Sequence, residues 1–399
     1  MRRVHRIAIL AASLMFVASS PAPAMQGDAP ELGELLRAGR LAEAIVLAEA
    51  YYEQVRGARN HQPLLVARVA NNLGTLYAQA DKLAEAADMY RDALAVRREQ
   101  LGDNDRDTLA TEANLGFILY RQGRLSEAAG LLDANRDRAI AALGPDHERA
   151  LVASNHLGLV RIAQSRLAEA EAIFTDLAER RERIDGADSE AALSVLGNLS
   201  AILWEQQRNA EAAIIAERVL AGRQRLLGDD HAETDLAKIA LAAIYADFGR
   251  TDEALTLYRT VFDARRQRYG DNDPRTALPA NNAAGILMRS GRFDEAEDLY
   301  DRVIAIRGAA LGENHPSTLI ARSNMALLQF RRGDLDEANR IAADVLAGRR
   351  ELFGMTHPYA QSSAAMLLRG RLQAGEGAQT LAPGRALVAG IRERRSAER

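Results

Sequence analysis

The feature that most constrains this chain is a repeat of 42 residues that continues without insertion through most of its 399 positions. Self-similarity at a fixed period is the signature of an array of stacked structural units. Three separate columns share the period, which makes chance a poor explanation. A Glu-Ala pair starts at Glu43, Glu85, Glu127, Glu169, Glu211, Glu253, Glu295 and Glu337. A glycine stands at Gly102, Gly144, Gly186, Gly228, Gly270, Gly312 and Gly354. The third column holds Asn72, Asn114, His156, Asn198, Ala240, Asn282 and Asn324.

Within one unit, residues 271–312, the pattern is helical. Residues at three- and four-residue steps run from Leu278 to Arg289, the spacing of one helix face. A breaker at Ser290–Gly291 separates them from a second helical pattern that starts at Phe293. Gly312 is placed to end that second helix. Each unit is therefore predicted to be a helix–turn–helix.

Small and large residues also recur in register. Ala296 and its equivalents are expected where the second helix approaches the first closely, because a larger side chain there would overpack. The column that contains Tyr90, Phe174, Tyr258 and Tyr300 is expected to fill the space between neighbouring units.

The repeat resembles the tetratricopeptide repeat in its long, kinesin light chain-like form. The resemblance rests on NNAAGILMRSGRFDEAEDLYDRVIAI, followed by LGENHPST at Leu311–Thr318, and extends over about residues 30–370. It implies an all-α fold, a right-handed α-solenoid of stacked helix–turn–helix repeats. It implies much less about function, since such scaffolds serve many partners.

The chain is expected to have four parts. Residues 1–24 resemble a signal peptide, with a basic start at Arg2, Arg3 and Arg6, an apolar stretch, and small residues around Ala24. The mature chain would then begin near Met25; the alternative is an uncleaved membrane anchor, for which the apolar stretch is short. Residues 25–62 are predicted to be a partial repeat and cap, and residues 63–354 seven full repeats whose first helices begin near 63, 106, 148, 190, 232, 274 and 316. Residues 355–399 are predicted to be a degenerate repeat with a cap helix at Arg385–Arg395.

Composition excludes several functions. The chain has no cysteine, which removes disulfides, thiolate metal sites and a cysteine nucleophile. Its formal charge of −4 becomes −7 without the three arginines of residues 1–24, so nothing attracts it to nucleic acid or to anionic lipid. Export without a second apolar span indicates the periplasm or the medium of a bacterium.

In the family that the chain resembles, the first helix of each repeat lines a concave groove. The resemblance therefore places Asn72, Asn114, His156, Asn198, Asn282 and Asn324 where a bound peptide's backbone could be contacted, since an amide both donates and accepts. The alternative is that these residues join neighbouring repeats. One turn further along, Arg121, Arg289 and Arg331, together with the acidic Glu205 and Asp247, predict a charge gradient that orients a ligand; the alternative is solvated charge.

Two better-known ligands are not implied. Chaperone-binding members hold a carboxylate with a lysine one position before the asparagine, and no repeat here has that lysine; the position holds Asn71, Ala113, Asn155, Gly197, Ile239, Asn281 and Ser323. Kinesin heavy chain is not implied either, because the light chain's coiled coil is absent.

No motif for chemistry was found. His147, His231, His315 and His357 stand one or two repeats apart, too far to share a metal, and are expected to cap helices. The repeated glutamates also occur once per unit, so they provide no carboxylate pair. There is no phosphate loop, HExxH or GxSxG motif. We therefore expect no catalytic, cofactor or metal site. The leading hypothesis is an exported scaffold that binds a protein or peptide; the second is a self-assembling envelope component, and an enzyme is the third.

Overall fold

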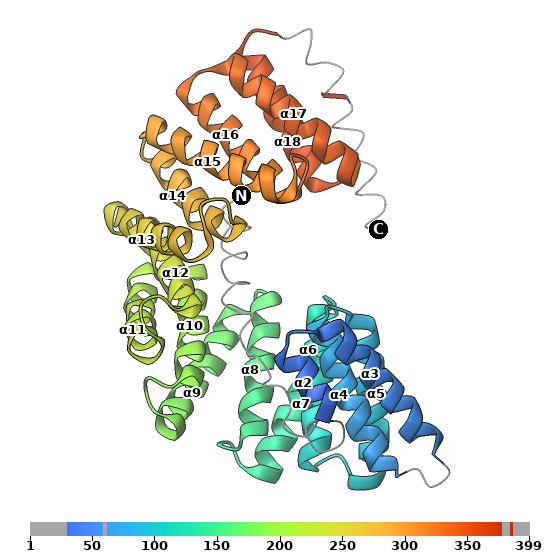
Figure 1. The fold of residues 1–399 in the computed structure, drawn as a ribbon. Helices are drawn as coiled ribbons and strands as arrows, with labels where there is room; N and C mark the ends of the chain where they lie inside the picture. The colour runs from blue at the N-terminus through green and yellow to red at the C-terminus, as the bar shows by residue number, and fades with distance from the viewer. Residues whose placement is uncertain (1–29, 59–61, 377–383, 386–399) are drawn as a thin grey trace. The chain divides into compact units, whose positions relative to one another are not determined.

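The computed structural model describes residues 30–58, 62–376 and 384–385, and all regular structure within them is helical (Figure 1). The predicted signal peptide lies outside these residues, and so does the predicted cap helix beyond Arg385. Among the described residues, no helix combines the length and the apolar character that crossing a membrane requires.

The helices alternate between two roles, as the repeat predicts. A partial repeat comes first, made of α2 (Pro30–Arg37) and α3 (Leu41–Gly57). The first helices of the following repeats are α4 (Pro63–Gln79), α6 (Arg106–Arg121), α8 (Glu148–Ala163), α10 (Glu190–Glu205), α12 (Ala232–Phe248), α14 (Ala277–Arg289), α16 (Pro316–Arg332) and α18 (Pro358–Gln373). The second helices are α5 (Leu83–Leu101), α7 (Leu125–Leu143), α9 (Leu167–Asp185), α11 (Asn209–Leu227), α13 (Thr251–Tyr269), α15 (Phe293–Leu311) and α17 (Leu335–Phe353).

The predicted starts of the first helices are confirmed, with one difference at residue 274. There the chain forms a 3₁₀ turn, η2 (Pro274–Thr276), before α14 begins at Ala277. Pro279 has no backbone N–H to donate to the carbonyl of Arg275, so the α-helical bonding pattern starts later in this repeat. Arg265 donates to that carbonyl instead, at 2.9 Å.

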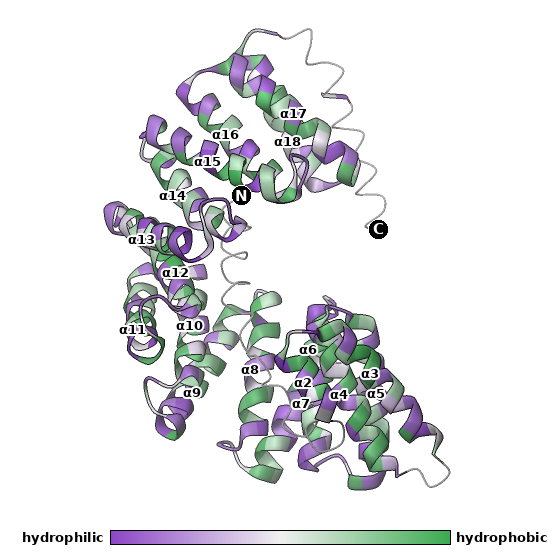
Figure 2. Ribbon diagram, viewed as in Figure 1, coloured by the Kyte–Doolittle hydropathy of each residue, from purple (hydrophilic) through white to green (hydrophobic). Residues whose placement is uncertain are grey.

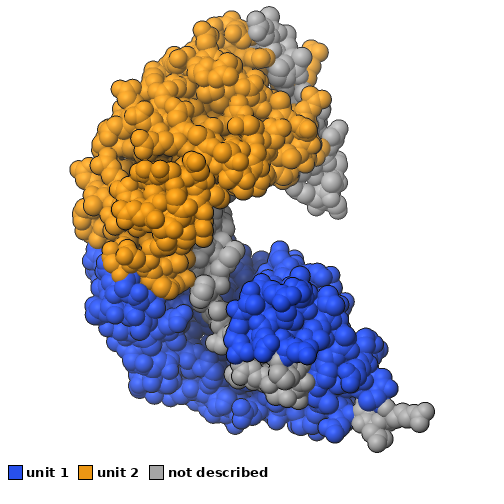
Figure 3. Space-filling view, viewed as in Figure 1, with its two compact units in different colours: residues 1–228 blue, residues 229–399 orange. Residues whose placement is uncertain are grey.

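The chain divides into two compact units, Met1–Gly228 and Asp229–Arg399 (Figure 3). The repeat pattern does not mark this division, because Gly228 occupies the same column as the glycine that ends every other second helix. Within each unit, helices pack against their neighbours in chain order. Successive first helices also contact each other, α6 with α8 in one unit, and α12 with α14 and α14 with α16 in the other. The first helices are therefore the closely spaced side of each stack.

Apolar residues face the helix contacts and polar residues face outward, so most helices show both colours in Figure 2. The alanine of the Glu-Ala pair is buried in all eight occurrences, with Ala296 fully inaccessible and Ala338 only 4% exposed. This burial agrees with the close approach predicted for that column. Burial without a long side chain lets two helix backbones approach each other at little entropic cost.

The repeated polar residues close the turns. Each glycine of the glycine column ends a second helix with a φ between 75° and 96°, a conformation that glycine adopts without strain. Six arginines just before a second helix donate to the glutamate three residues later; Arg124 and Glu127 lie 2.8 Å apart, and Arg292 and Glu295 lie 2.6 Å apart. The predicted place of the glutamates, in the first turn of the second helix, is confirmed.

A buried arginine column, which the sequence patterns did not single out, joins successive repeats; one of its members, Arg307, is only half-buried. Arg97, Arg265, Arg307 and Arg349 lie on second helices. Each Nη1 donates to a backbone carbonyl at the start of the next first helix, ten residues later; that of Arg97 reaches Asp107 at 2.9 Å. Burial lowers the pKa of Arg97, Arg307 and Arg349, but arginine remains charged at any ordinary pH. A charged donor that bridges two repeats fixes their register.

The large residue of the aromatic column packs against a small one on the first helix of its own repeat as well as in the core that neighbouring repeats share. The ring of Tyr90 lies over Gly74, and it also belongs to the core cluster that includes α6. The ring of Phe174 lies over Gly158. At the end of the array the large residue is on the first helix and the small one follows it. Leu368 on α18 lies against Gly384, which occupies the position equivalent to Tyr90.

This fit predicts opposite effects for two Gly→Ala changes in the same unit. In Gly158→Ala the new Cβ would lie 2.6 Å from Cε2 of Phe174, so the variant should lose about 1–3 kcal/mol of unfolding free energy. In Gly197→Ala, on α10, the new Cβ meets no heavy atom within 4 Å, and the better helix former should add up to about 1 kcal/mol. Denaturant unfolding of both variants checks this, and equal stabilities would contradict it.

Candidate partner-binding face

The candidate site is the first-helix face, by which we mean the side of the first helices that carries positions 278, 282, 285 and 289 of α14 and their equivalents at steps of 42 residues. On α14, Leu278 and Gly285 are half-buried, Asn282 is buried and Arg289 is exposed. The face is thus built from one helix per repeat, and its composition changes from repeat to repeat.

The asparagine column is largely used by the fold. Asn72, His156, Asn198 and Asn282 are buried, whereas Asn114 and Asn324 are half-buried. Asn324 Nδ2 donates to Asn281 Oδ1 of the preceding first helix at 3.2 Å. This contact joins neighbouring first helices, which is the alternative that the sequence left open. Contact of the column with a bound peptide stays a prediction, and Asn114 and Asn324 are the members with exposed atoms.

His156 replaces asparagine in this column and is held in the same way. Its Nδ1 lies 3.3 Å from the carbonyl oxygen of Ala113, and its ring stacks on Phe117 with centroids 4.6 Å apart. Burial lowers the pKa of His156 to about 4, although the carbonyl of Ala113 acts in the opposite direction. The imidazole is therefore neutral at neutral pH and serves as a packed polar link between α6 and α8.

The three arginines predicted for the site differ in how they are engaged. Arg121 donates to the carbonyl of Ala78 at 2.8 Å and to Oδ1 of Asp81 at 2.7 Å, so it holds the preceding turn. Arg289 and Arg331 are exposed and form no ion pair within the part of the chain that the structure describes. Both lie near the hydroxyl of Tyr300, where their charge lowers a pKa that burial raises. This pair is the least constrained charge on the face.

Apolar side chains on the same face were not singled out from the sequence. Phe117, Leu278 and Leu327 are half-buried at positions between the polar ones. The repeat pattern gives the spacing of these side chains, but a buried side of a helix and a partly exposed side have the same period. Only the burial of each residue in the structure distinguishes the two kinds of side.

The residues that resembled catalytic or metal-binding sets have structural roles. Nδ1 of His147, His231, His315 and His357 accepts the backbone N–H two residues later, each at 3.2 Å, so the predicted caps are confirmed. Asp105, Ser189 and Asp273 cap their helices from the same column. Among the described residues, no group of three histidines or carboxylates is placed to hold a metal ion.

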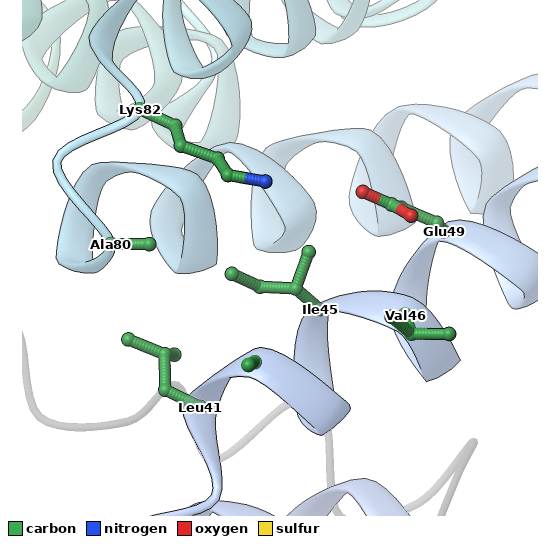
Figure 4. Close-up of a pocket in the computed structure, with 7 residues that line it drawn as sticks. Leu41, Ile45, Val46, Glu49, Ala80 and Lys82 are labelled. Carbon is green, nitrogen blue, oxygen red and sulfur yellow. The ribbon is translucent and has the colours of Figure 1, made fainter.

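A pocket of about 490 Å³ opens beside the partial repeat, between α3 and the turn after α4 (Figure 4). Leu41, Ile45 and Val46 form its apolar side, and Glu49 and Lys82 stand at its rim. Comparison with the next two repeats explains why the pocket is open. There Gln122 and Gln164 occupy the column of Ala80 and donate to the carbonyls of Leu83 and Leu125. Ala80 is too short to make this contact, so the corresponding space is left open.

Comparisons with known proteins agree with this architecture. A family model of the tetratricopeptide repeat matches residues 30–99, 107–183, 148–225, 192–267 and 275–351. These ranges span well over half of the sequence, and the chain belongs to the tetratricopeptide repeat family.

Two solved structures illustrate the likeness. BtubC (BKLC) from P. vanneervenii has a TM-score of 0.51 and 23% identity over 58% of this chain and 92% of its own. A signal transduction ATPase with a tetratricopeptide repeat sensor from Pyrococcus horikoshii has a TM-score of 0.58 and 13% identity, over 88% of this chain and 52% of its own. At these identities the likeness is one of fold. No curated protein matches the sequence.

The buried imidazole predicts how stability depends on pH. The unfolded chain takes up a proton near pH 6.5, whereas folded His156 does so only near pH 4. Its share of stability is therefore complete above pH 6.5 and is lost as pH falls toward 4, by roughly 3 kcal/mol. His156→Asn restores the residue of most other repeats and should flatten this loss. Urea unfolding of both proteins between pH 7 and 4.5 measures the difference, and parallel curves would contradict the assignment.

Proposed function

We propose that this chain is an exported, non-catalytic scaffold whose first-helix face binds a segment of a protein or peptide partner. Tetratricopeptide repeat proteins are generally scaffolds of this kind, and they bind protein or peptide partners. The chemistry of this face supports a ligand that carries both negative charge and apolar side chains.

The observation that carries the proposal is the pair Arg289 and Arg331. They occupy the same position on α14 and α16, which contact each other, and both guanidinium groups are exposed and without an ion pair among the described residues. Arg121 in the same column shows the alternative, since it is held by Ala78 and Asp81. A guanidinium group presents a rigid set of donors that suits a carboxylate. Two in succession favour an acidic segment.

Apolar and amide groups accompany the two arginines. Leu278 on α14 and Leu327 on α16 are half-buried. Asn324, three residues before Leu327 on α16, is half-buried as well. An extended segment that alternates acidic and apolar side chains would meet both kinds of group. The ligand class we propose is therefore an acidic, leucine-containing stretch of a partner.

Export is the second part of the proposal. Three arginines, an uncharged stretch at residues 7–19 and small residues before Met25 follow the order of a secretory signal. A partner would then be met in the periplasm or outside the cell.

Charge reversal tests the binding face. In Arg289→Glu/Arg331→Glu, the affinity for short fluorescein-labelled peptides of leucine and aspartate should fall about tenfold or more, since hydrogen bonds to charged groups contribute roughly 1.5–3 kcal/mol each. Fluorescence anisotropy at low and high salt measures this.

The matched control is Arg302→Glu/Arg350→Glu, which makes the same change of net charge at exposed arginines of two second helices, α15 and α17, away from the face. It should leave the affinity unchanged. Equal binding of leucine–lysine peptides, or equal effects of the two double variants, would reject the proposed ligand class.

Export predicts a shortened mature protein. Expressed in a Gram-negative host, the chain should appear in the periplasmic fraction with an intact mass that corresponds to a start near Met25. Ala24→Arg should block this cleavage, because small residues are required before the scissile bond. A full-length chain in the cytosol or the membrane fraction would refute export with cleavage.

A further inference from the structure

An apolar notch opens on the opposite side of the second unit from the first-helix face. It lies among α13, α14 and α15 and has a volume of about 210 Å³. Ala283 and Leu287 of α14, with Phe262 of α13, lie deep in it and are buried. Four exposed charged residues surround its mouth, namely Arg259, Glu295, Asp298 and Arg302.

The notch exists because one repeat departs from the pattern. The column of Ala283 holds a large aliphatic residue in the six other full repeats: Leu73, Leu115, Leu157, Leu199, Leu241 and Met325. Each of those side chains is buried. Alanine at this one position removes a leucine's volume from the core, and neighbouring side chains do not close the space. An apolar cavity of about 150 Å³ is already large enough to hold a benzene molecule.

A matching projection stands elsewhere on the same chain. Ile214 on α11 is 67% exposed, the largest exposed fraction among the large apolar side chains of the described residues. Ile214 lies in the same column as Asp298, so it points outward from a second helix as Asp298 does. A branched aliphatic side chain in water is costly to leave exposed, at about 1.5–3 kcal/mol relative to burial.

The charges around the projection and the notch are complementary. Ile214 stands between Glu211 and Arg218, and the notch opens between Glu295 and Arg302. Both pairs are seven residues apart, about 10 Å along a helix. If α11 lies antiparallel to α15, Glu211 meets Arg302 and Arg218 meets Glu295, while Ile214 reaches the middle of the notch. The parallel orientation would oppose like charges.

We propose that Ile214 of one copy of this chain inserts into the Ala283 notch of a second copy. These charges already have ion-pair partners, such as Glu182 for Arg218 at 2.9 Å. Such pairs at the surface are weak competitors because water screens them. The contact joins two different surfaces, so in a pair one copy keeps a free notch and the other keeps a free isoleucine. Association is then head to tail and grows with concentration. This surface is separate from the first-helix face, and it supports self-assembly independently of peptide binding.

Two single variants test the contact on the full mature chain. Ile214→Asp removes the projection and keeps the notch, whereas Ala283→Leu fills the notch with the residue of most other repeats and keeps the projection. By sedimentation velocity across a concentration series, the wild type should exceed the monomer mass reversibly. Each variant alone should lose at least tenfold in association constant.

Mixing the variants is the decisive measurement. An equimolar mixture of Ile214→Asp and Ala283→Leu contains one intact notch and one intact isoleucine per pair, so it should form a dimer and nothing larger. Arg302→Glu, a charge with no ion pair in the described residues, should weaken association by severalfold at low salt.

Val46→Asp is the matched control. Val46 is 64% exposed in the same column as Ile214, but Ala50 stands where Arg218 would be, so the charge pattern is incomplete. Its association should equal that of the wild type. If Ala283→Leu does not fold, the contrast between Ile214→Asp and Val46→Asp decides the matter alone. A wild type that stays monomeric at every soluble concentration would overturn the proposal, as would Ile214→Asp that associates normally or a mixture that remains monomeric.

Discussion

The structure depends on the close approach of the two helices within each repeat. Alanine in the Glu-Ala pair lies buried at every occurrence, and Gly74, Gly116 and Gly158 on first helices lie against Tyr90, Leu132 and Phe174 of second helices. A single helical pair has too little surface to bury its apolar side, so each repeat is stable only against its neighbours. Small residues at the crossing allow that burial, and the fit of Phe174 over Gly158 shows how little space remains.

Polar groups then fix the register between repeats. The buried arginine column reaches from one second helix to the next first helix, and Asn324 reaches to Asn281 between successive first helices. A buried donor that loses its acceptor costs about 1–3 kcal/mol, so a slipped register is penalised at several points at once. Asn72, Asn198 and Asn282 are also buried in the stack, so little of their surface is available to a ligand.

The candidate interaction surfaces lie where the repeat departs from its own pattern. Arg289 and Arg331 follow a column that is neutral or acidic in four other repeats, and Ala283 interrupts a column of leucines. Residues that break a local rule without improving stability are expected at functional positions. Both departures fall in residues 229–399, on opposite sides of α14, so one unit carries a charged surface and an apolar notch. They are separate proposals, because neither surface shares a side chain with the other.

The sequence alone determined the fold class, the helix boundaries to within a few residues and the capping roles of His147 and its equivalents, because these follow from local spacing and from the chemistry of turns. It also located the candidate columns. It did not show which columns face outward, since a helix has the same period whether its side is buried or exposed. Only tertiary packing decided that His156 is enclosed against Phe117, that Arg121 is held by Asp81 while Arg289 and Arg331 are not, and that alanine at position 283 leaves a space instead of being closed over. The physical reason is that burial and ion pairing depend on side chains about 40 residues away along the chain, which no local pattern contains.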